Sequence, residues 1–396
     1  MKAGRGKVRL GDITDVQSGG TPLISNKQLW NGGIAWYSSG ELNSTFTTAS
    51  ERTVSAVGLE KSNAKLFPAG SLLIGMYDTA AMKMSILDRA AAFNQAIAGV
   101  KPNDQIDIRF VFYALNSIKE VLLGQRRGVR QKNLSLGKVR DFEIPFRSLE
   151  EQKRIVTLLD EAFAHIATAK ANAEQNLQNA RALFDSHLQS VLSVRGENWV
   201  EKRIEEWCTS IIDCVNKTAP VVDGPTPFKM IRTTNIRNGL VNVSSVRYVT
   251  EETYKVWTRR QVPEKGDVIL TREAPMGEVG MLLSGDKIFL GQRLVSYRAN
   301  ANLLNNNFLL LALQSGDLQG QIHAKASGST VQHMRVPDTK NLLLSAPPLH
   351  QQLAVVNELE RLRLATQRLE SIYQQKLTAL NALKKSLLHQ AFSAQL

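Results

Sequence analysis

The chain has 396 residues, of which 43% are hydrophobic and 21% charged, and its formal net charge is +13 at pH 7. The length predicts two or three domains, and the hydrophobic fraction is sufficient for buried cores. No apolar run reaches membrane-spanning length, and no apolar segment follows the basic first residues, which argues against a signal peptide. Cys208 and Cys214 cannot form a disulfide framework, so we expect core thiols and a cytoplasmic location.

The positive charge is unevenly distributed along the chain. Residues 1–148 contain 20 Lys and Arg against 12 Asp and Glu, and residues 194–348 contain 19 against 15. A basic surplus concentrated in two long segments indicates a polyanionic partner, and we expect nucleic acid.

Residues 1–148 contain short apolar runs separated by glycine, asparagine and proline, with one helical stretch at about 109–123. This pattern predicts an α+β domain with short strands. The stretch WYSS at 36–39 predicts a strand with a core aromatic residue. The densest group of cations is the stretch RRGVRQKN at 126–133, which suits DNA contact because arginine and glutamine form bidentate contacts with bases; a solvated surface loop is the alternative. The predicted DNA contacts in this domain are Arg126, Arg127, Arg130, Gln131 and Lys132.

Residues 149–193 contain no proline or glycine, which predicts one long helix. Apolar residues recur from Leu149 in steps of three and four, and this period is typical of a coiled-coil seam. At about 1.5 Å per residue the helix would be roughly 67 Å long. That length exceeds the width of a domain of about 150 residues, so we expect the helix to leave its own domain and to pair with another helix.

Residues 197–348 repeat the first domain faintly. The stretch FPAGSLLI at 67–74 corresponds to VPEKGDVI at 262–269, and a helical stretch is expected at about 307–323. These features predict a second α+β domain. Its predicted DNA contacts are cations and amides near strand ends and loops: Lys229, Arg232, Asn235, Arg237, Arg272, Arg293, Gln332 and Arg335.

Residues 349–393 repeat the long helix at a shift of 200 residues. The stretch ALFDSHLQSVLS at 182–193 returns as ALKKSLLHQAFS at 382–393, and Gln152 and Gln352 occupy the same register. Antiparallel pairing of the two helices is the economical arrangement, because a parallel pair would require the second domain to extend back along the first helix. The predicted seam and partner-contact residues are Leu149, Val156, Leu159, Phe163, Ile166, Leu177 and Phe184 in the first helix, and Val355, Leu359, Leu362, Leu369, Tyr373, Leu380, Leu383 and Leu387 in the second.

Motifs of self-contained catalysis are missing from the sequence. It has no P-loop, no amino-methyltransferase loop of the Asn/Asp-Pro-Pro-Tyr/Phe type and no nuclease motif after Pro337-Asp338. The six histidines are scattered, and neither they nor the cysteines have the spacing of a metal site. We therefore expect no catalytic residues and no metal ligands in this chain.

The layout resembles the specificity (S) subunit of type I restriction–modification enzymes. The resemblance is carried by LEEQKRIV at 149–156 opening the first helix, by LGDI at 10–13 and SGGTP at 18–22, and by the similar ends of the two helices. It covers essentially the whole chain. The second helix departs from the family pattern, because LHQQLAVV at 349–356 keeps a glutamine in register but lacks the acidic and basic residues.

The resemblance implies an α+β fold with two pseudo-repeated target recognition domains separated by two long antiparallel coiled-coil helices. The expected boundaries are target recognition domains at 1–148 and 197–348, and conserved helices at 149–196 and 349–396. Each domain would read one half of a bipartite site in double-stranded DNA, while the helices set the spacing and dock methyltransferase (M) subunits, two in number. Restriction (R) subunits would join the full complex, and S-adenosylmethionine, ATP and Mg would bind to the partner subunits, not to this chain.

Two other functions compete with this interpretation. The first is a non-enzymatic scaffold whose two domains bind proteins while the coiled coil sets their distance; it shares the layout but does not require basic domains. The second is a self-contained restriction–methylation protein with a concealed active site. Retention on duplex DNA and binding of S-adenosylmethionine by the isolated chain would separate the three.

Overall fold

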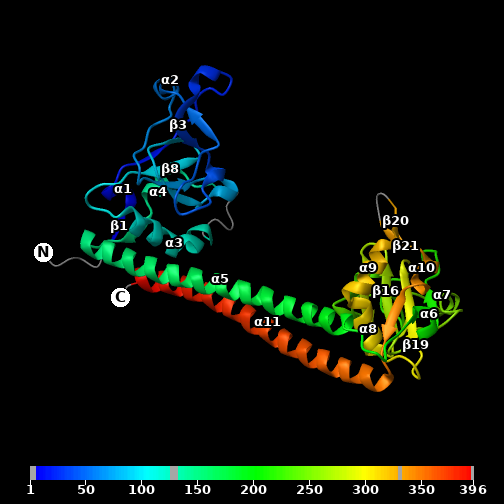
Figure 1. Cartoon of the computed structure of the whole chain (residues 1–396). Helices are drawn as coiled ribbons and strands as arrows, with labels where there is room; N and C mark the ends of the chain where they lie inside the picture. Colours follow the sequence, from blue (N-terminus) through cyan, green and yellow to red (C-terminus); the bar gives the residue numbers. More distant parts are fainter. Residues whose placement is uncertain (1–5, 125–132, 329–331, 394–396) are drawn as a thin grey trace. The chain divides into compact units, whose positions relative to one another are not determined.

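The computed structural model describes residues 6–124, 133–328 and 332–393. The chain divides into two compact units, the first comprising residues 1–173 and 375–396, the second residues 174–374. Each unit contains one globule of mixed strands and helices, together with a part of each of two long helices (Figure 1).

Both predicted long helices are present and continuous. Helix α5 extends over Leu149–Ser193 and helix α11 over Leu349–Phe392. The hydroxyl of Ser148 accepts the backbone N–H of Glu151 and so caps the start of α5, and two glutamates in the first turn favour the positive end of the helix dipole. In the parts of the chain that the structure describes, no helix is long and apolar enough to cross a membrane.

The globule of the first unit contains a four-stranded antiparallel sheet in the order β2-β8-β5-β6 and a three-stranded sheet in the order β4-β3-β7. The strands are β2 (Val16–Ser18), β3 (Trp30–Tyr37), β4 (Arg52–Val54), β5 (Leu72–Gly75), β6 (Met84–Ile86), β7 (Ala92–Phe93) and β8 (Ile97–Val100). A further pair, β1 (Lys7–Arg9) with β9 (Glu143–Pro145), joins the two ends of the globule just before α5. Strands β5 and β8 are buried along their whole length, which explains their uninterrupted apolar sequences.

Helices and short helical turns complete this globule. They are α1 (Leu10–Ile13), α2 (Ala56–Glu60), α3 (Ile108–Gly124) and α4 (Leu136–Arg140), with 3-10 turns η1 (Lys27–Leu29), η2 (Ser39–Glu41) and η3 (Asp78–Ala80). The helix expected at about 109–123 is therefore confirmed as α3. Its residues Phe110 and Tyr113 pack with Val156 and Leu159 of α5, so α3 attaches the globule to the long helix (Figure 1).

The main sheet of the second globule has more strands than that of the first. A six-stranded sheet has the order β11-β19-β16-β17-β14-β13, and a three-stranded sheet has the order β15-β12-β18. The strands are β10 (Val200–Arg203), β11 (Cys208–Asp213), β12 (Phe228–Ile231), β13 (Ile236–Arg237), β14 (Gly239–Val241), β15 (Arg247–Tyr248), β16 (Val268–Arg272), β17 (Met276–Met281), β18 (Lys287–Leu290), β19 (Leu294–Ala299), β20 (Ala326–Ser327), β21 (His333–Met334) and β22 (Leu343–Ala346). The helices are α6 (Ile204–Trp207), α7 (Glu251–Trp257), α8 (Asn306–Gln314), α9 (Gly316–Ala324) and α10 (Val336–Lys340), with the 3-10 turn η4 (Thr233–Asn235).

The helix expected at about 307–323 is interrupted once. Ser315 is extended, closes α8 and caps α9 through its hydroxyl, which accepts the N–H of Leu318. The expected core thiols are also present: Cys214 is buried and Cys208 partly buried, both are free, and burial raises the pKa of the Cys208 thiol to about 12.

The two globules share local structure where their sequences correspond. In both, a glycine with positive φ precedes a buried strand: Gly70 (φ 80°) before β5 and Gly266 (φ 96°) before β16. The N–H of Gly70 donates to the carbonyl of Leu87, and the N–H of Gly266 donates to the carbonyl of Leu282. Glycine suits this turn because other residues adopt positive φ only with strain.

The long helices run antiparallel to one another within each unit. In the first unit Phe163 of α5 lies beneath the ammonium of Lys384 of α11, 4.9 Å from the ring centre, and Lys170 donates to Asn381. In the second unit the guanidinium of Arg363 lies 5.0 Å from the ring centre of Phe184, and Arg181 pairs with Glu370 at 3.1 Å. A shift of 200 residues converts each contact of the first unit into a contact of the second, so the repeated sequence makes equivalent contacts in both units.

A buried glutamine attaches each globule to its helix. Gln352 is 0% exposed; it accepts the N–H of Asn305 and donates to the carbonyls of Leu303 and Pro347 at 2.8–2.9 Å. Gln152 makes the same three contacts in the first unit, with Asp107, Gln105 and Arg147. The helix opening is therefore equivalent in both units despite the loss of charged residues from the second.

Most of the predicted seam and partner-contact residues are buried or partly buried, and two in α11 are exposed. All seven predicted α5 residues, Leu149, Val156, Leu159, Phe163, Ile166, Leu177 and Phe184, are buried or partly buried. In α11 the same holds for Val355, Leu359, Leu362, Tyr373, Leu380 and Leu387. Leu369 and Leu383 are 39% and 46% exposed. Their neighbours Glu370 and Lys384 contact α5 instead, at Arg181 and Phe163.

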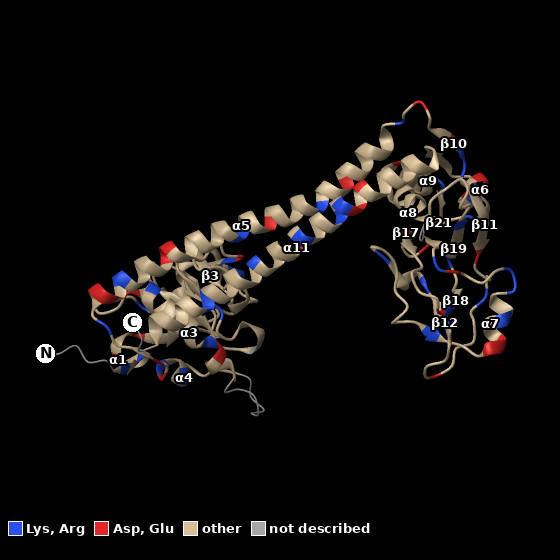
Figure 2. Cartoon of the chain, turned by 90° about the horizontal axis from the view of Figure 1, so that it is seen from below, with Lys and Arg blue, Asp and Glu red and all other residues tan. Residues whose placement is uncertain are grey.

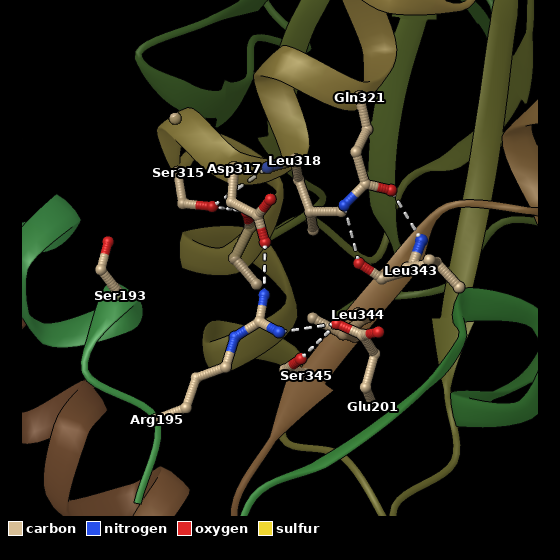
Figure 3. A network of polar contacts seen from close by, with 12 residues as sticks. Ser193, Arg195, Glu201, Ser315, Asp317, Leu318, Gln321, Leu343, Leu344 and Ser345 are labelled. Atoms are coloured by element: carbon tan, nitrogen blue, oxygen red, sulfur yellow. Dashed lines mark hydrogen bonds and ion pairs between the residues drawn. The ribbon is translucent and has the colours of Figure 1, made fainter.

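The end of α5 is tied to the second globule by a polar network (Figure 3). Arg195 forms ion pairs with Glu201 at 2.7 Å and Asp317 at 3.0 Å, and Ser345 donates to Glu201. Gln321 exchanges two hydrogen bonds with the backbone of Leu343 beside it. The segment that leaves the helix is thereby fixed to β10, α9 and β22.

Candidate nucleic-acid interface

Four cations surround a pocket of about 310 Å³ in the second globule. The lining residues are Lys217, Thr218, Ala219, Met230, Arg232, Thr233, Thr234, Arg247, Gln292 and Arg293. We call this site the basic pocket. Figure 2 shows Lys and Arg on and beside β12, where the pocket lies.

The fold assembles the basic pocket from separate loops. Strands β12 and β18 pair in parallel, so their carboxyl ends lie at the same edge of the sheet. Arg232 follows β12, and Gln292 with Arg293 follows β18. Lys217 comes from the loop after β11, and Arg247 opens β15, which pairs with β12.

The charge of the pocket is largely uncompensated. Within the described ranges Lys217, Arg232 and Arg247 have no carboxylate within 4.0 Å, and the Nε of Arg232 is buried without a hydrogen-bond partner. Arg293 is held by Glu273 at 3.1 Å. Met230 forms part of an apolar floor. Cations with neighbouring hydroxyl and amide groups are the donors that contact phosphates and base edges in DNA.

Two of the predicted DNA contacts, Arg232 and Arg293, meet in the basic pocket. Lys217 and Arg247, which also line it, were not predicted. Each is an isolated cation in the sequence, without the clustering that marked the other candidates, and only the pairing of β12 with β15 and β18 brings them together.

Two predicted contacts, Asn235 and Lys229, have structural partners instead. The prediction for Asn235 is wrong: it is 3% exposed, and its amide donates to the carbonyls of Asn242 and Ser245 while its oxygen accepts the N–H of Arg232. Lys229 pairs with Asp286 at 2.9 Å. Hydrogen bonds from Ser284 and Lys229 lower the pKa of the Asp286 carboxyl.

The remaining candidates of the second globule lie outside the basic pocket. Arg237 donates to the backbone of Ile236 and Thr233, and Arg272 donates to the carbonyl of Met334 at 2.8 Å. Gln332 and Arg335 are exposed. They remain predictions as DNA contacts.

The strongest candidates of the first globule, Arg126, Arg127, Arg130, Gln131 and Lys132, lie outside the described residues. The sheet edge equivalent to the basic pocket follows β3 and β7, which also pair in parallel. It carries Gln95, which accepts a hydrogen bond from Thr21, and Glu41, which caps the N–H of Ser38 as Asn235 caps Arg232. The equivalent edges of the two globules therefore differ in charge.

The glycines of the SGGTP motif are required by close packing. A Cβ on Gly19 would lie 2.1 Å from the carbonyl oxygen of Phe93, and one on Gly20 would lie 2.3 Å from the backbone of Asn63. The carbonyl of Gly20 accepts the indole N–H of Trp36, which is 6% exposed, so the expected core aromatic is confirmed.

No group of His, Cys, Asp and Glu in the described ranges is arranged to hold a metal ion. The sequence profile of the type I restriction modification DNA specificity domain matches twice, at residues 4–179 and 196–379. The chain belongs to this family. Each match contains one globule and most of the long helix that follows it, which confirms the resemblance based on the helix openings and the glycine motif.

Individual relatives are distant in sequence but match over most of the chain. The EcoBI specificity subunit of Escherichia coli is 22% identical over 330 residues, covering 77% of this chain and 69% of that protein. The MjaIX specificity subunit of Methanocaldococcus jannaschii is 20% identical over 359 residues, covering 86% and 82%.

Solved structures agree with the fold. The HsdS subunit from Thermoanaerobacter tengcongensis has a TM-score of 0.63 at 16% identity, with 99% of this chain and 97% of that chain covered. A chain solved in work on assembly and conformational transition of the type I R-M system reaches 0.77 at 16% identity, covering 99% and 98%. The α+β fold with two repeated domains and two long helices is thereby confirmed.

Proposed function

We propose that this chain is the DNA-recognition subunit of a type I restriction–modification complex, with each globule reading one half of a bipartite target. The observation that carries this proposal is the double match to a DNA specificity domain, one match for each globule. The uncompensated cations of the basic pocket support it, because a protein-binding scaffold has no need of them.

The long helices are proposed to connect the two readers, to set the gap between half-sites and to dock two methyltransferase subunits. Exposed apolar side chains support the docking role: Leu158 (54%), Leu183 (49%), Leu364 (60%), Leu369 (39%), Ile372 (47%) and Leu383 (46%) lie on α5 and α11. Leu183 and Leu383 are equivalent under the repeat. Apolar side chains in such numbers on a helical surface favour a protein interface.

Chemistry is proposed to belong to the partners. Methyltransferase subunits would bind S-adenosylmethionine, and restriction subunits would use ATP and Mg. This chain would supply recognition alone and act as a non-catalytic subunit. Its loops would then need only to bind and orient the duplex.

DNA binding by the assembled complex tests the proposal. Lys217→Ala with Arg247→Ala removes two cations that line the basic pocket. Each phosphate contact contributes about 0.9 to the slope of log affinity against log salt, so the double variant is expected to lower the slope by roughly 2. Arg259→Ala is the matched control, because Arg259 is exposed but does not line the pocket.

An unchanged salt slope in the double variant would exclude the basic pocket as a DNA contact. The function as a whole is tested by methylome sequencing of cells that express the chain with its partners. A bipartite methylated motif is expected. Methylation without a bipartite motif, or no retention of the complex on duplex DNA, would contradict it.

A further inference from the structure

Two adjacent aliphatic side chains project into solvent from the loop that follows β2 in the first globule. Leu23 is 67% exposed and Ile24 is 64% exposed. A single exposed aliphatic residue is ordinary on a protein surface, but a neighbouring pair that exposes most of its area is costly and indicates a binding role.

The backbone beneath this pair is firmly held. The carbonyl of Leu23 accepts the indole N–H of Trp30 at 3.3 Å and the N–H of Asn26 at 3.1 Å. The side chain of Asn26 in turn accepts the N–H of Gln28 and starts the turn η1. The aliphatic pair is therefore presented on a fixed turn.

Two cations share a pocket with Ile24. Ile24, Lys27, Trp30, Asn31 and Arg52 line a shallow pocket of about 230 Å³. The guanidinium of Arg52 lies 5.7 Å from the centre of the Trp30 ring, which restricts it to one side of the pocket. Within the described residues neither Lys27 nor Arg52 has an acidic partner within 4.0 Å. An apolar tip beside two free cations is complementary to a duplex, whose stacked bases lie beside rows of phosphates.

The second globule exposes a similar tip at the same place in its fold. The loop after β11 presents Pro220 and Val221, the latter 46% exposed. The N–H of Val222 donates to Tyr248 and holds the loop against β15. Lys217 and Arg247 of the basic pocket lie on the same loop and strand. The repetition of an apolar tip beside cations in both globules argues for a role in the shared function.

We propose that Leu23 and Ile24 form a wedge that enters the duplex at a base step within the half-site read by the first globule. The wedge would partly unstack neighbouring base pairs and bend the DNA, while Lys27 and Arg52 contact the flanking phosphates. Leucine and isoleucine are among the side chains that separate base steps in proteins that kink DNA. Sequence preference then arises from the ease of unstacking as well as from contacts to base edges. This inference rests on the proposed DNA-recognition function.

The test compares the complex carrying Leu23→Ser with Ile24→Ser against the wild type. The duplex probe contains the methylated motif, with 2-aminopurine placed at successive positions and a fluorophore pair at its ends. The wild type is expected to increase 2-aminopurine fluorescence at one step of one half-site and to shorten the end-to-end distance. The double variant is expected to lose both signals and to bind about tenfold more weakly with an unchanged salt slope.

Two further variants make the result specific. Val121→Ser changes a side chain that is 60% exposed on α3, and it is expected to leave both signals intact. Leu23→Met with Ile24→Val keeps the tip apolar and is expected to restore unstacking. Circular dichroism and co-purification with the methyltransferase check folding and assembly.

The outcomes separate the wedge from the function on which it rests. If the wild-type complex binds its motif and the serine variant distorts the DNA as much as the wild type does, the wedge is overturned and DNA recognition is unaffected. Loss of the methyltransferase from the folded serine variant overturns the wedge in favour of a protein contact. A wild-type complex with no preference for any duplex overturns the proposed function itself, and the wedge with it.

Discussion

Replacing Gln352 with leucine tests whether one buried side chain joins the second globule to its helix. Gln352→Leu conserves volume but leaves the N–H of Asn305 without its acceptor and the carbonyls of Leu303 and Pro347 without their donor, in a site that is 0% exposed. Each buried group left unsatisfied costs about 1–3 kcal/mol. Because carbonyl oxygens tolerate partial satisfaction better than N–H groups do, we expect a total loss of about 3–5 kcal/mol.

Urea unfolding of the full chain measures this loss, and hydrogen–deuterium exchange locates it. For a unit of about 200 residues the expected change corresponds to a melting temperature lower by on the order of 10 °C. Exchange is expected to increase at the start of α8, where Asn305 is the N-cap. Gln351→Leu is the control, because Gln351 is the preceding residue and is only partly buried. It is expected to change the free energy of unfolding by less than about 0.5 kcal/mol.

The equivalent substitution in the first unit extends the test. Gln152→Leu removes the contacts to Asp107, Gln105 and Arg147, so a loss of similar size is expected, confined to the first unit. A loss below about 1 kcal/mol for both variants would refute the reasoning that these glutamines fix the globules to the helices.

Two more predictions concern the first unit. Leu159→Asp places a carboxylate at a position that is 5% exposed, in a cluster with Phe110, Val156 and Ala391. The variant is expected to separate α5 from α11, to prevent co-purification with the methyltransferase and to lower the free energy of unfolding by about 3–5 kcal/mol. Normal assembly would contradict the seam assignment. Burial and a hydrogen bond to Asp160 raise the pKa of Tyr113 from its normal value near 10 to about 12. The folded state therefore favours the protonated phenol, and the stability this provides is fully present below pH 10 and is lost as the pH rises to about 12. Tyr113→Phe has no phenol to ionise, so the difference in unfolding free energy between wild type and variant is expected to narrow between pH 10 and about 12. Parallel profiles of unfolding free energy against pH would contradict the role of Tyr113.

The sequence by itself determined the long helices and the repeat. Residues 149–193 and 349–392 form helices because nothing within them interrupts the backbone hydrogen bonds, and this information is local. The turns at Gly70 and Gly266 are equally local, since a positive φ depends on the residue that adopts it. The shift of 200 residues was visible for the same reason.

The buried face of α11 could not be decided from its sequence. Leucines occur on more than one side of this helix, so the apolar pattern did not show that Leu369 and Leu383 would be exposed. In the structure the guanidinium of Arg363 and the ammonium of Lys384 lie over the rings of Phe184 and Phe163. A cation is attracted to the face of an aromatic ring, and a pattern of apolar residues alone does not predict such a contact.

The basic pocket was decided by tertiary structure alone. Lys217, Arg232, Arg247 and Arg293 are separated by stretches of chain, and the pairing of β12 with β15 and β18 gathers them at one edge. Asn235, in contrast, was predicted from the sequence to contact DNA, but its amide donates hydrogen bonds to backbone carbonyls of the same globule. Helices and turns follow from the hydrogen bonding of neighbouring residues, whereas a binding surface depends on which distant strands pair and on which polar groups their backbones have already engaged.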